Sequence, residues 1–184
     1  QGFKNNEGKA TSGVAGDPQY ATNSDIMSGV GDYDIELTNL GDFISNNYSV
    51  TTQKGKLVIR KATVTVTALD ASRIYGDPDP AFKFTVTDFK NGQLWSDSVV
   101  KGAPVFLPAA TILDGVGQND LSLSNGSLTA DNYDFNLVKG KLTIVKADLT
   151  VKAEDTARIY GDPNPDFRAS YAGFKNGESL ISSG

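Results

Sequence analysis

Apolar and polar residues alternate through the middle of the chain, which is the pattern of strands that bury one face. Val64, Val66 and Ala68 lie on one side of the first such stretch, and threonines occupy the positions between them. Stretches of the same two-residue period follow at 82–86, 121–123, 133–137 and 142–144. Residues 92–100 lack this period and predict a short helical turn. The pattern therefore predicts a mainly β protein.

The apolar face changes parity at two places along the chain. Apolar positions are odd-numbered at Leu57 and Ile59 but even-numbered at Val64 and Val66, and a second change separates residues 144 and 149. Because strand faces alternate with a period of two, a parity change moves the apolar set to the other face. Steps 61–62 and 146–147 therefore predict domain boundaries with almost no linker, which indicates a stiff array.

Several short sequences recur at an interval of 85 or 86 residues. They are Arg-Ile-Tyr-Gly-Asp-Pro at 73–78 and 158–163, Phe-Lys-Asn at 3–5, 89–91 and 174–176, Gly-Val-Gly at 29–31 and 115–117, and Lys-Gly-Lys-Leu at 54–57 and 139–142. A fixed interval of this kind signals repeated structural units. We expect one complete repeat at 62–146, the later part of a preceding repeat at 1–61, and the opening part of a following repeat at 147–184.

Composition narrows the classes of function. The net charge of −5 gives no basic surface for nucleic acid or for an anionic membrane. The absence of Cys and His removes disulfides, thiolate catalysis and the usual general base. No run approaches the roughly 20 apolar residues of a membrane span. We therefore expect no enzyme activity, no catalytic residues, no cofactor, no nucleic-acid partner and no membrane insertion.

The Tyr-Gly-Asp-Pro turns offer two alternatives. Oxygen-bearing side chains that could ligate calcium are Asp77, Asp79, Asp162, Asn164 and Asp166. The other interpretation is a turn whose carboxylates cap backbone N–H groups, because the spacing lacks the glycine and distal glutamate of an EF-hand. Gly76 and Gly161 are expected to adopt backbone angles that other residues avoid, or to allow a close approach of a neighbour.

Three aromatic residues are candidates for stacking on a sugar. Tyr75 and Tyr160 could stack on a glycan or pack against their own cores, and packing is the favoured interpretation. Trp95 is the only tryptophan, and its counterpart in the third copy is Leu180. No convergent polar groups accompany these rings in the sequence.

The order of the motifs resembles the MBG-type repeats of large bacterial surface proteins. The matching motifs are Tyr-Gly-Asp-Pro-x-Pro-x-Phe at 75–82, Asp-Phe-x-Asn-Gly at 88–92, Asn-Tyr-x-Phe at 132–135 and Lys-Gly-x-Leu-x-Ile-x-Lys-Ala at 139–147. From the strand pattern we expect each repeat to be a small antiparallel β module, sandwich-like, and the alternative is a β-grasp-like arrangement with one short helix each, because residues 92–100 could pack across a sheet. The resemblance itself implies tandem β-rich modules. It also implies an extracellular extender or stalk of a bacterial cell-surface adhesin. The competing function is a module that itself binds a glycan or a host protein.

The two partial repeats predict self-association. Residues 147–184 would expose Leu149, Val151 and Phe167 together with an unpaired strand edge, and such edges recruit other strands. The near-zero linkers and the parity changes place the two partial repeats at opposite ends of the middle module. We therefore expect the tail of one chain to add strands to the head of the next, with these three side chains in the partner's core. The contact is head-to-tail, and the expected partners are the protein itself or neighbouring repeats.

Overall fold

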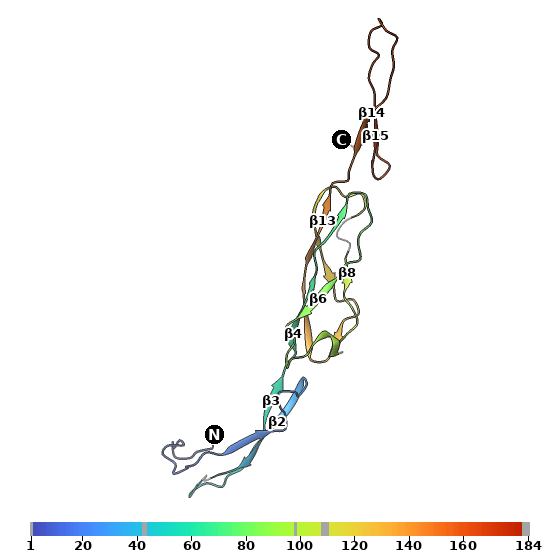
Figure 1. The fold of residues 1–184 in the computed structure, drawn as a ribbon. Coiled ribbons are helices and arrows are strands. Elements are labelled where there is room, and N and C mark those ends of the chain that lie inside the picture. The colour runs from blue at the N-terminus through green and yellow to red at the C-terminus, as the bar shows by residue number, and fades with distance from the viewer. Residues whose placement is uncertain (1, 42–43, 98, 108–110, 182–184) are drawn as a thin grey trace. The chain divides into compact units, whose positions relative to one another are not determined.

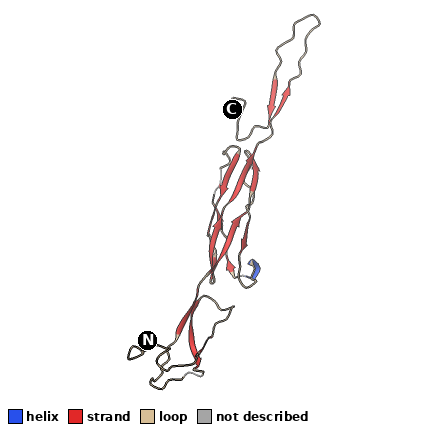
Figure 2. Ribbon diagram, turned by 90° about the vertical axis from the view of Figure 1, so that its left-hand side faces the viewer, coloured by secondary structure: helices blue, strands red, loops and turns tan. Residues whose placement is uncertain are grey.

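A computed structural model describes residues 2–41, 44–97, 99–107 and 111–181. The chain divides into two compact units. The first comprises Gln1–Thr63, Phe89–Val100 and Ala130–Asp134, and the second comprises Val64–Asp88, Lys101–Thr129 and Phe135–Gly184. Strands make up almost all of the regular structure in the described residues, which confirms the mainly β class (Figure 2). The predicted boundaries at 61–62 and 146–147 stay predictions.

The first unit contains a three-stranded antiparallel sheet. Its strands are β1 (Gln19–Thr22), β2 (Gly31–Asn39) and β3 (Gly55–Ile59), in the order β1-β2-β3 (Figure 1). Polar residues at alternate positions of β2 give the sheet one charged face, where Lys54 lies 3.0 Å from Asp34 and Lys56 lies 3.2 Å from Asp32. Among the described residues β3 is an edge strand.

The middle of the chain contributes ten short strands. They are β4 (Ala62–Ala68), β5 (Ala71–Ile74), β6 (Phe84–Thr87), β7 (Val100–Lys101), β8 (Val105–Phe106), β9 (Gly117–Leu121), β10 (Leu123–Ser124), β11 (Thr129–Ala130), β12 (Tyr133–Val138) and β13 (Gly140–Val145). They form two three-stranded sheets, in the orders β12-β4-β6 and β5-β13-β9, and two pairs, β10-β8 and β11-β7.

The core of the second unit draws on both three-stranded sheets. Val64 and Val66 of β4 and Leu121 of β9 are 0% exposed, as is Leu142 of β13, and Ile144 is 1% exposed. The alternation predicted for these strands is confirmed. Burying such a side chain contributes about 1.5–3 kcal/mol relative to leaving it in water, so these few residues supply much of the stabilising apolar burial.

The architecture departs in two ways from antiparallel hairpins covered by a helix: one strand pair is parallel, and among the described residues no helix covers a sheet. β13 pairs with β5 in parallel, with Leu142 opposite Ala71. The helical turn predicted within 92–100 is confirmed as a 3-10 turn at Trp95–Asp97, which buries none of its residues. In the described part of the chain it is the only helical element, so no helix there covers a sheet as the β-grasp alternative requires, and none could cross a membrane.

The end of the second unit forms a separate hairpin of β14 (Thr150–Ala153) and β15 (Ala169–Ala172) (Figure 1). Val151 lies opposite Tyr171 in this hairpin, just as Val66 lies opposite Val86 where β4 pairs with β6. Both residues of each pair are displaced by 85 positions from their counterparts. The hairpin β14–β15 is therefore a structural copy of β4–β6.

The sheet of the first unit copies another part of the middle repeat. Leu57 of β3 lies opposite Tyr33 of β2, as Leu142 of β13 lies opposite Asn119 of β9. In the same way the β1–β2 pair corresponds to the β8–β10 pair. The recurrence seen in the sequence thus extends to strand pairing and register.

Candidate functional site

One turn occurs three times, and we call its copies the Lys-Asn turns: residues 4–7, 90–93 and 175–178. The two central residues have positive φ in every copy, for example 55° at Asn91 and 68° at Gly92. The last backbone N–H bonds to the first carbonyl oxygen, at 3.0 Å from Gln93 to Lys90. These are the features of a type I′ turn, which favours Asn and Gly because they tolerate this backbone region.

The last residue of each Lys-Asn turn accepts a hydrogen bond from a tyrosine. Tyr48 donates to Glu7, Tyr133 donates to Gln93 at 2.5 Å, and Tyr75 donates to Glu178. The bond to Glu7 raises the pKa of the Tyr48 hydroxyl, because only the protonated hydroxyl can donate this hydrogen bond.

The tyrosines of the first two copies also hold the start of the turn. The hydroxyl oxygens of Tyr48 and Tyr133 accept the backbone N–H of Lys4 and Lys90, at 3.1 and 3.0 Å. Each ring meets the phenylalanine of Phe-Lys-Asn edge-on, with a centroid distance of 5.6 Å in both copies. The turn is thus fixed by one side chain at both of its ends.

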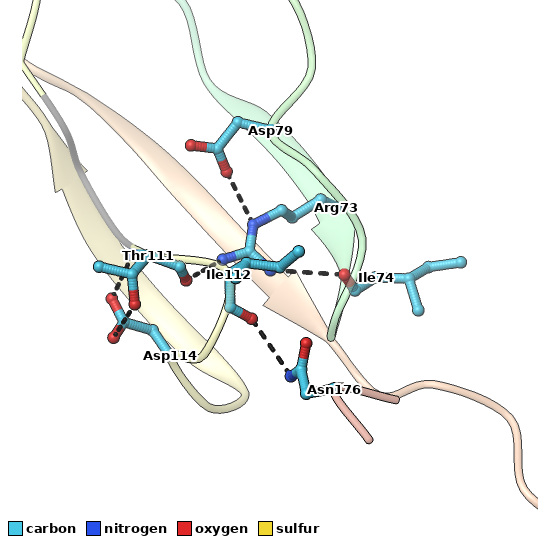
Figure 3. Close-up of polar contacts among 7 residues, drawn as sticks. All are labelled: Arg73, Ile74, Asp79, Thr111, Ile112, Asp114 and Asn176. Atoms are coloured by element: carbon cyan, nitrogen blue, oxygen red, sulfur yellow. Dashed lines mark hydrogen bonds and ion pairs between the residues drawn. The ribbon is translucent and has the colours of Figure 1, made fainter. Parts of the chain in front are cut away.

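The asparagine of the Lys-Asn turn reaches a different part of the chain. Asn91 donates from its amide nitrogen to the carbonyl oxygen of Ile26 at 3.0 Å, and Asn176 donates to that of Ile112 at 3.4 Å (Figure 3). Ile26 and Ile112 are counterparts in consecutive repeats. The same donor and the same acceptor therefore meet in both units.

Arg73 holds the Tyr-Gly-Asp-Pro turn from inside. Its side chain is only 2% exposed; Nε lies 2.7 Å from Asp79 Oδ1, and Nη2 donates to the carbonyl of Thr111 at 2.7 Å (Figure 3). In the second copy Arg158 bonds to Asn164 at 2.8 Å, on the surface. Sequence reasoning missed this arginine as a functional residue. The available signal was an Arg followed six positions later by a residue with a side-chain oxygen.

The Tyr-Gly-Asp-Pro turn of the middle repeat touches the third Lys-Asn turn. Gly76 has a φ of 77°, and a Cβ added there would overlap the Lys175 side chain, with Cγ at 2.9 Å. Asp77 pairs with Lys175 Nζ at 2.7 Å. Gly161 has a φ of 95°, but among the described residues nothing lies within 4 Å of the position of an added Cβ. The expectation of an unusual backbone angle is confirmed for both glycines, and that of a close neighbour for Gly76.

Comparison with known proteins places the chain in a family. The sequence model of the MBG domain (YGX type) family matches residues 64–143 and 149–183, which is more than half of the chain. The chain belongs to this family. The resemblance expected from the motifs is confirmed, and both matched stretches contain a Tyr-Gly-Asp-Pro turn of an MBG repeat. The comparisons with curated proteins and with solved structures found no match.

Two carboxylates of the Tyr-Gly-Asp-Pro turn in the middle repeat have cationic partners, one from the same repeat and one from the next. Asp79 faces Arg73 and Asp77 faces Lys175, which is the arrangement of a turn held by ion pairs. In the described part of the chain, no group of three or more acidic, His or Cys side chains is placed to hold a metal ion. The geometry therefore favours a structural role for Asp77 and Asp79 over calcium ligation.

The candidate sugar-stacking rings differ in their surroundings. Tyr75 is engaged with Glu178, Tyr160 is 100% exposed, and Trp95 is 37% exposed. The residues predicted to enter a partner's core lie on the surface of the MBG tail: Leu149 is 47% exposed, Val151 58% and Phe167 72%. Their part in self-association stays a prediction.

Proposed function

We propose that this MBG chain is a non-catalytic structural segment of a bacterial cell-surface adhesin, where it spaces a ligand-binding region from the cell. The observation that supports this function is the recurrence of one module with the same strand register and the same turn contacts. Such a chain is built to be extended by further copies, as repeat arrays are. Among the described residues, several of the polar side chains that recur with the repeat hold its turns, as Arg73 and Tyr133 do.

The extracellular location can be tested on intact cells. Antibodies raised against residues 1–184 are applied to the source bacterium with and without permeabilisation. Surface display predicts equal labelling in the two conditions. Labelling only after permeabilisation would contradict the proposal.

The alternative function is a module that itself binds a glycan or a host protein. A glycan array and a panel of host matrix proteins are probed with the same fragment. The spacer function predicts no saturable binding. Clear binding to one ligand class would replace it with the alternative.

The same proposal includes head-to-tail self-association between copies of this chain. The exposed hairpin β14–β15 copies β4–β6, and β3 copies β13, but the edge of β3 that β5 would occupy is unpaired among the described residues. The first unit thus offers the open strand edge of an incomplete module. Residues 147–184 offer the strands that this module lacks. Between two copies they could combine by strand addition.

The middle repeat predicts the register of this assembly. Leu142 pairs with Ala71 and Ile144 pairs with Arg73 in the parallel pair β13–β5. The counterparts are Leu57 with Thr156 and Ile59 with Arg158 of a second copy. Leu149 and Val151 would then take the places of Val64 and Val66, both of which are 0% exposed.

A glycine provides the sharpest test of this assembly. A Cβ added to Gly140 would lie 2.5 Å from the Ala68 backbone oxygen, whereas one added to its counterpart Gly55 would meet Ile35 Cβ at an ordinary 3.6 Å. Gly55→Ala should therefore leave the single chain folded but block the partner's strand. Its control is Gly8→Ala, where nothing described lies within 4 Å.

Light scattering across a dilution series measures the association. We expect the mass of the wild type and of Gly8→Ala to rise with concentration, while Gly55→Ala stays monomeric. Val151→Asp should have the same effect, and Thr150→Asp, on the opposite face of β14, should not. A monomeric wild type at high concentration, or unchanged association in Gly55→Ala, would rule out the assembly.

A further inference from the structure

We infer that the Tyr-Gly-Asp-Pro turn of an MBG repeat is the docking surface for the Lys-Asn turn of the repeat that follows it. This inference rests on contacts within the second unit and on one counterpart contact within the first, and it does not depend on the location of the protein or on its self-association. It gives the most conspicuous motif of the sequence a partner of defined chemistry: a type I′ turn with a cation at its first position and a hydrogen-bond acceptor at its last.

Three consecutive residues of the docking surface are complementary to the incoming turn. The Tyr75 hydroxyl donates a hydrogen bond to the Glu178 carboxylate. Gly76 leaves room for the Lys175 side chain, whose Cγ and Cδ would lie 2.9 and 3.2 Å from an added Cβ. Asp77 completes the set with its ion pair to Lys175 Nζ at 2.7 Å. The Tyr75 hydroxyl thus meets a hydrogen-bond acceptor, and the space beside Gly76 holds the aliphatic part of the Lys175 side chain. The negative charge of Asp77 meets the positive charge of that lysine.

Another polar contact of the same turn recurs in the preceding repeat. Asn176 of the docked turn donates to the carbonyl of Ile112, and one repeat earlier Asn91 donates to the carbonyl of Ile26. The donors and the acceptors are each displaced by 85 or 86 positions. A contact that recurs with the period of the repeat is part of how consecutive repeats are joined.

The chain also contains an unoccupied copy of the docking surface. Tyr160 is 100% exposed, and the space above Gly161 is open among the described residues. Gly161 nevertheless has the same kind of backbone, with a φ of 95° against 77° at Gly76. The backbone conformation therefore does not require a bound turn. Matched substitutions at the two copies separate loss of docking from strain in the turn itself.

The test measures whether the hairpin β14–β15 tumbles with the rest of the second unit. Backbone ¹⁵N relaxation is recorded on the full chain, at a concentration where light scattering gives the mass of a monomer, for amides of β13 and of β15. Docking predicts one rotational correlation time for both strands in the wild type, and faster, independent motion of β15 in Gly76→Ala and in Tyr75→Phe. Gly161→Ala and Tyr160→Phe should leave the shared correlation time unchanged. Because the Lys175–Asp77 pair is partly exposed, added salt should also loosen β15.

Two outcomes would overturn the inference. One is independent motion of β15 in the wild type. The other is an equal effect of the paired substitutions at residues 76 and 161, since both replace a glycine of positive φ and only one of them blocks docking. Tyr75→Phe keeps the ring and removes only the hydroxyl, so it tests the bond to Glu178 without changing the backbone of the turn. Gly76→Ala, by contrast, also alters the turn. Equal relaxation in Tyr75→Phe and the wild type would remove that bond from the docking contact.

Discussion

Val66 and Val151 occupy the same position in two hairpins of the same register, yet Val66 is 0% exposed and Val151 is 58% exposed. The strand pairing is therefore the same in the two hairpins. The two valines differ in exposure because, among the described residues, other strands cover the first hairpin and not the second. In the middle repeat the strands β9 and β13 bring Leu121 and Leu142 into the core. Burial in an MBG module is thus a property of the complete set of strands.

The same contrast predicts the cost of truncating two equivalent leucines. Leu142 is 0% exposed and its counterpart Leu57 is 39% exposed. Leu142→Ala should lower the free energy of unfolding by about 2–5 kcal/mol, because it removes buried methyl groups and leaves a cavity. Leu57→Ala should cost much less. Urea denaturation at low protein concentration measures both, and equal losses would contradict the assignment of the core.

Arg73 should be far less replaceable than Arg158. Removing the buried guanidinium leaves Asp79 and the carbonyl of Thr111 without their partner, so Arg73→Ala should cost about 2–4 kcal/mol. Arg158→Ala removes a surface contact and should leave the melting temperature almost unchanged. Arg73→Lys keeps the charge but loses the geometry of the guanidinium, and an intermediate melting temperature is expected.

The Tyr48–Glu7 hydrogen bond predicts a pH dependence. The folded state raises the pKa of Tyr48 above its ordinary value of about 10, so the bond stabilises the fold below that pH. The contribution is lost as the pH rises through the folded-state pKa, because the unfolded chain ionises first. Ultraviolet titration of the wild type against Tyr48→Phe isolates this group. In Glu7→Ala the pKa should fall toward the ordinary value, and an unchanged titration curve would contradict the assigned cause.

Asn91 should be sensitive to a change of a single atom. Asn91→Asp tolerates the positive φ but cannot donate to the carbonyl of Ile26, so it should destabilise the local contact by about 0.5–1.5 kcal/mol. Faster amide hydrogen exchange in residues 26–30 measures the loss. Asn5→Asp, at the same position of the first Lys-Asn turn, is the matched control. Equal changes in the two variants would argue against the contact.

Much of the fold was predictable because its determinants are local. The alternation around Val64 and Val66 gives the buried face directly, and the Asn-Gly and Gly-Asp-Pro sequences indicate turns with positive φ. The interval between the motifs gives the repeat. Each of these signals needs only a few neighbouring residues.

Other features depend on residues distant in the sequence. The parallel pairing of β5 with β13 joins strands that no hairpin connects, so alternation gives no hint of it. The burial of Arg73 depends on Thr111, which lies 38 positions away. The docking of Glu178 on Tyr75 spans 103 positions. Composition and periodicity identify such residues as polar turn residues and do not reveal their partners.

The acceptor for the asparagine of the Lys-Asn turn is a main-chain carbonyl, both at Ile26 and at Ile112. Every amino acid provides that oxygen, so mutation of the acceptor residue does not by itself remove the bond. Duplication or unequal recombination within a gene of this kind can therefore bring together repeats that have diverged, and each new neighbour still offers the asparagine a partner. Such a junction allows a lineage to lengthen or shorten its array without evolving a new joint each time.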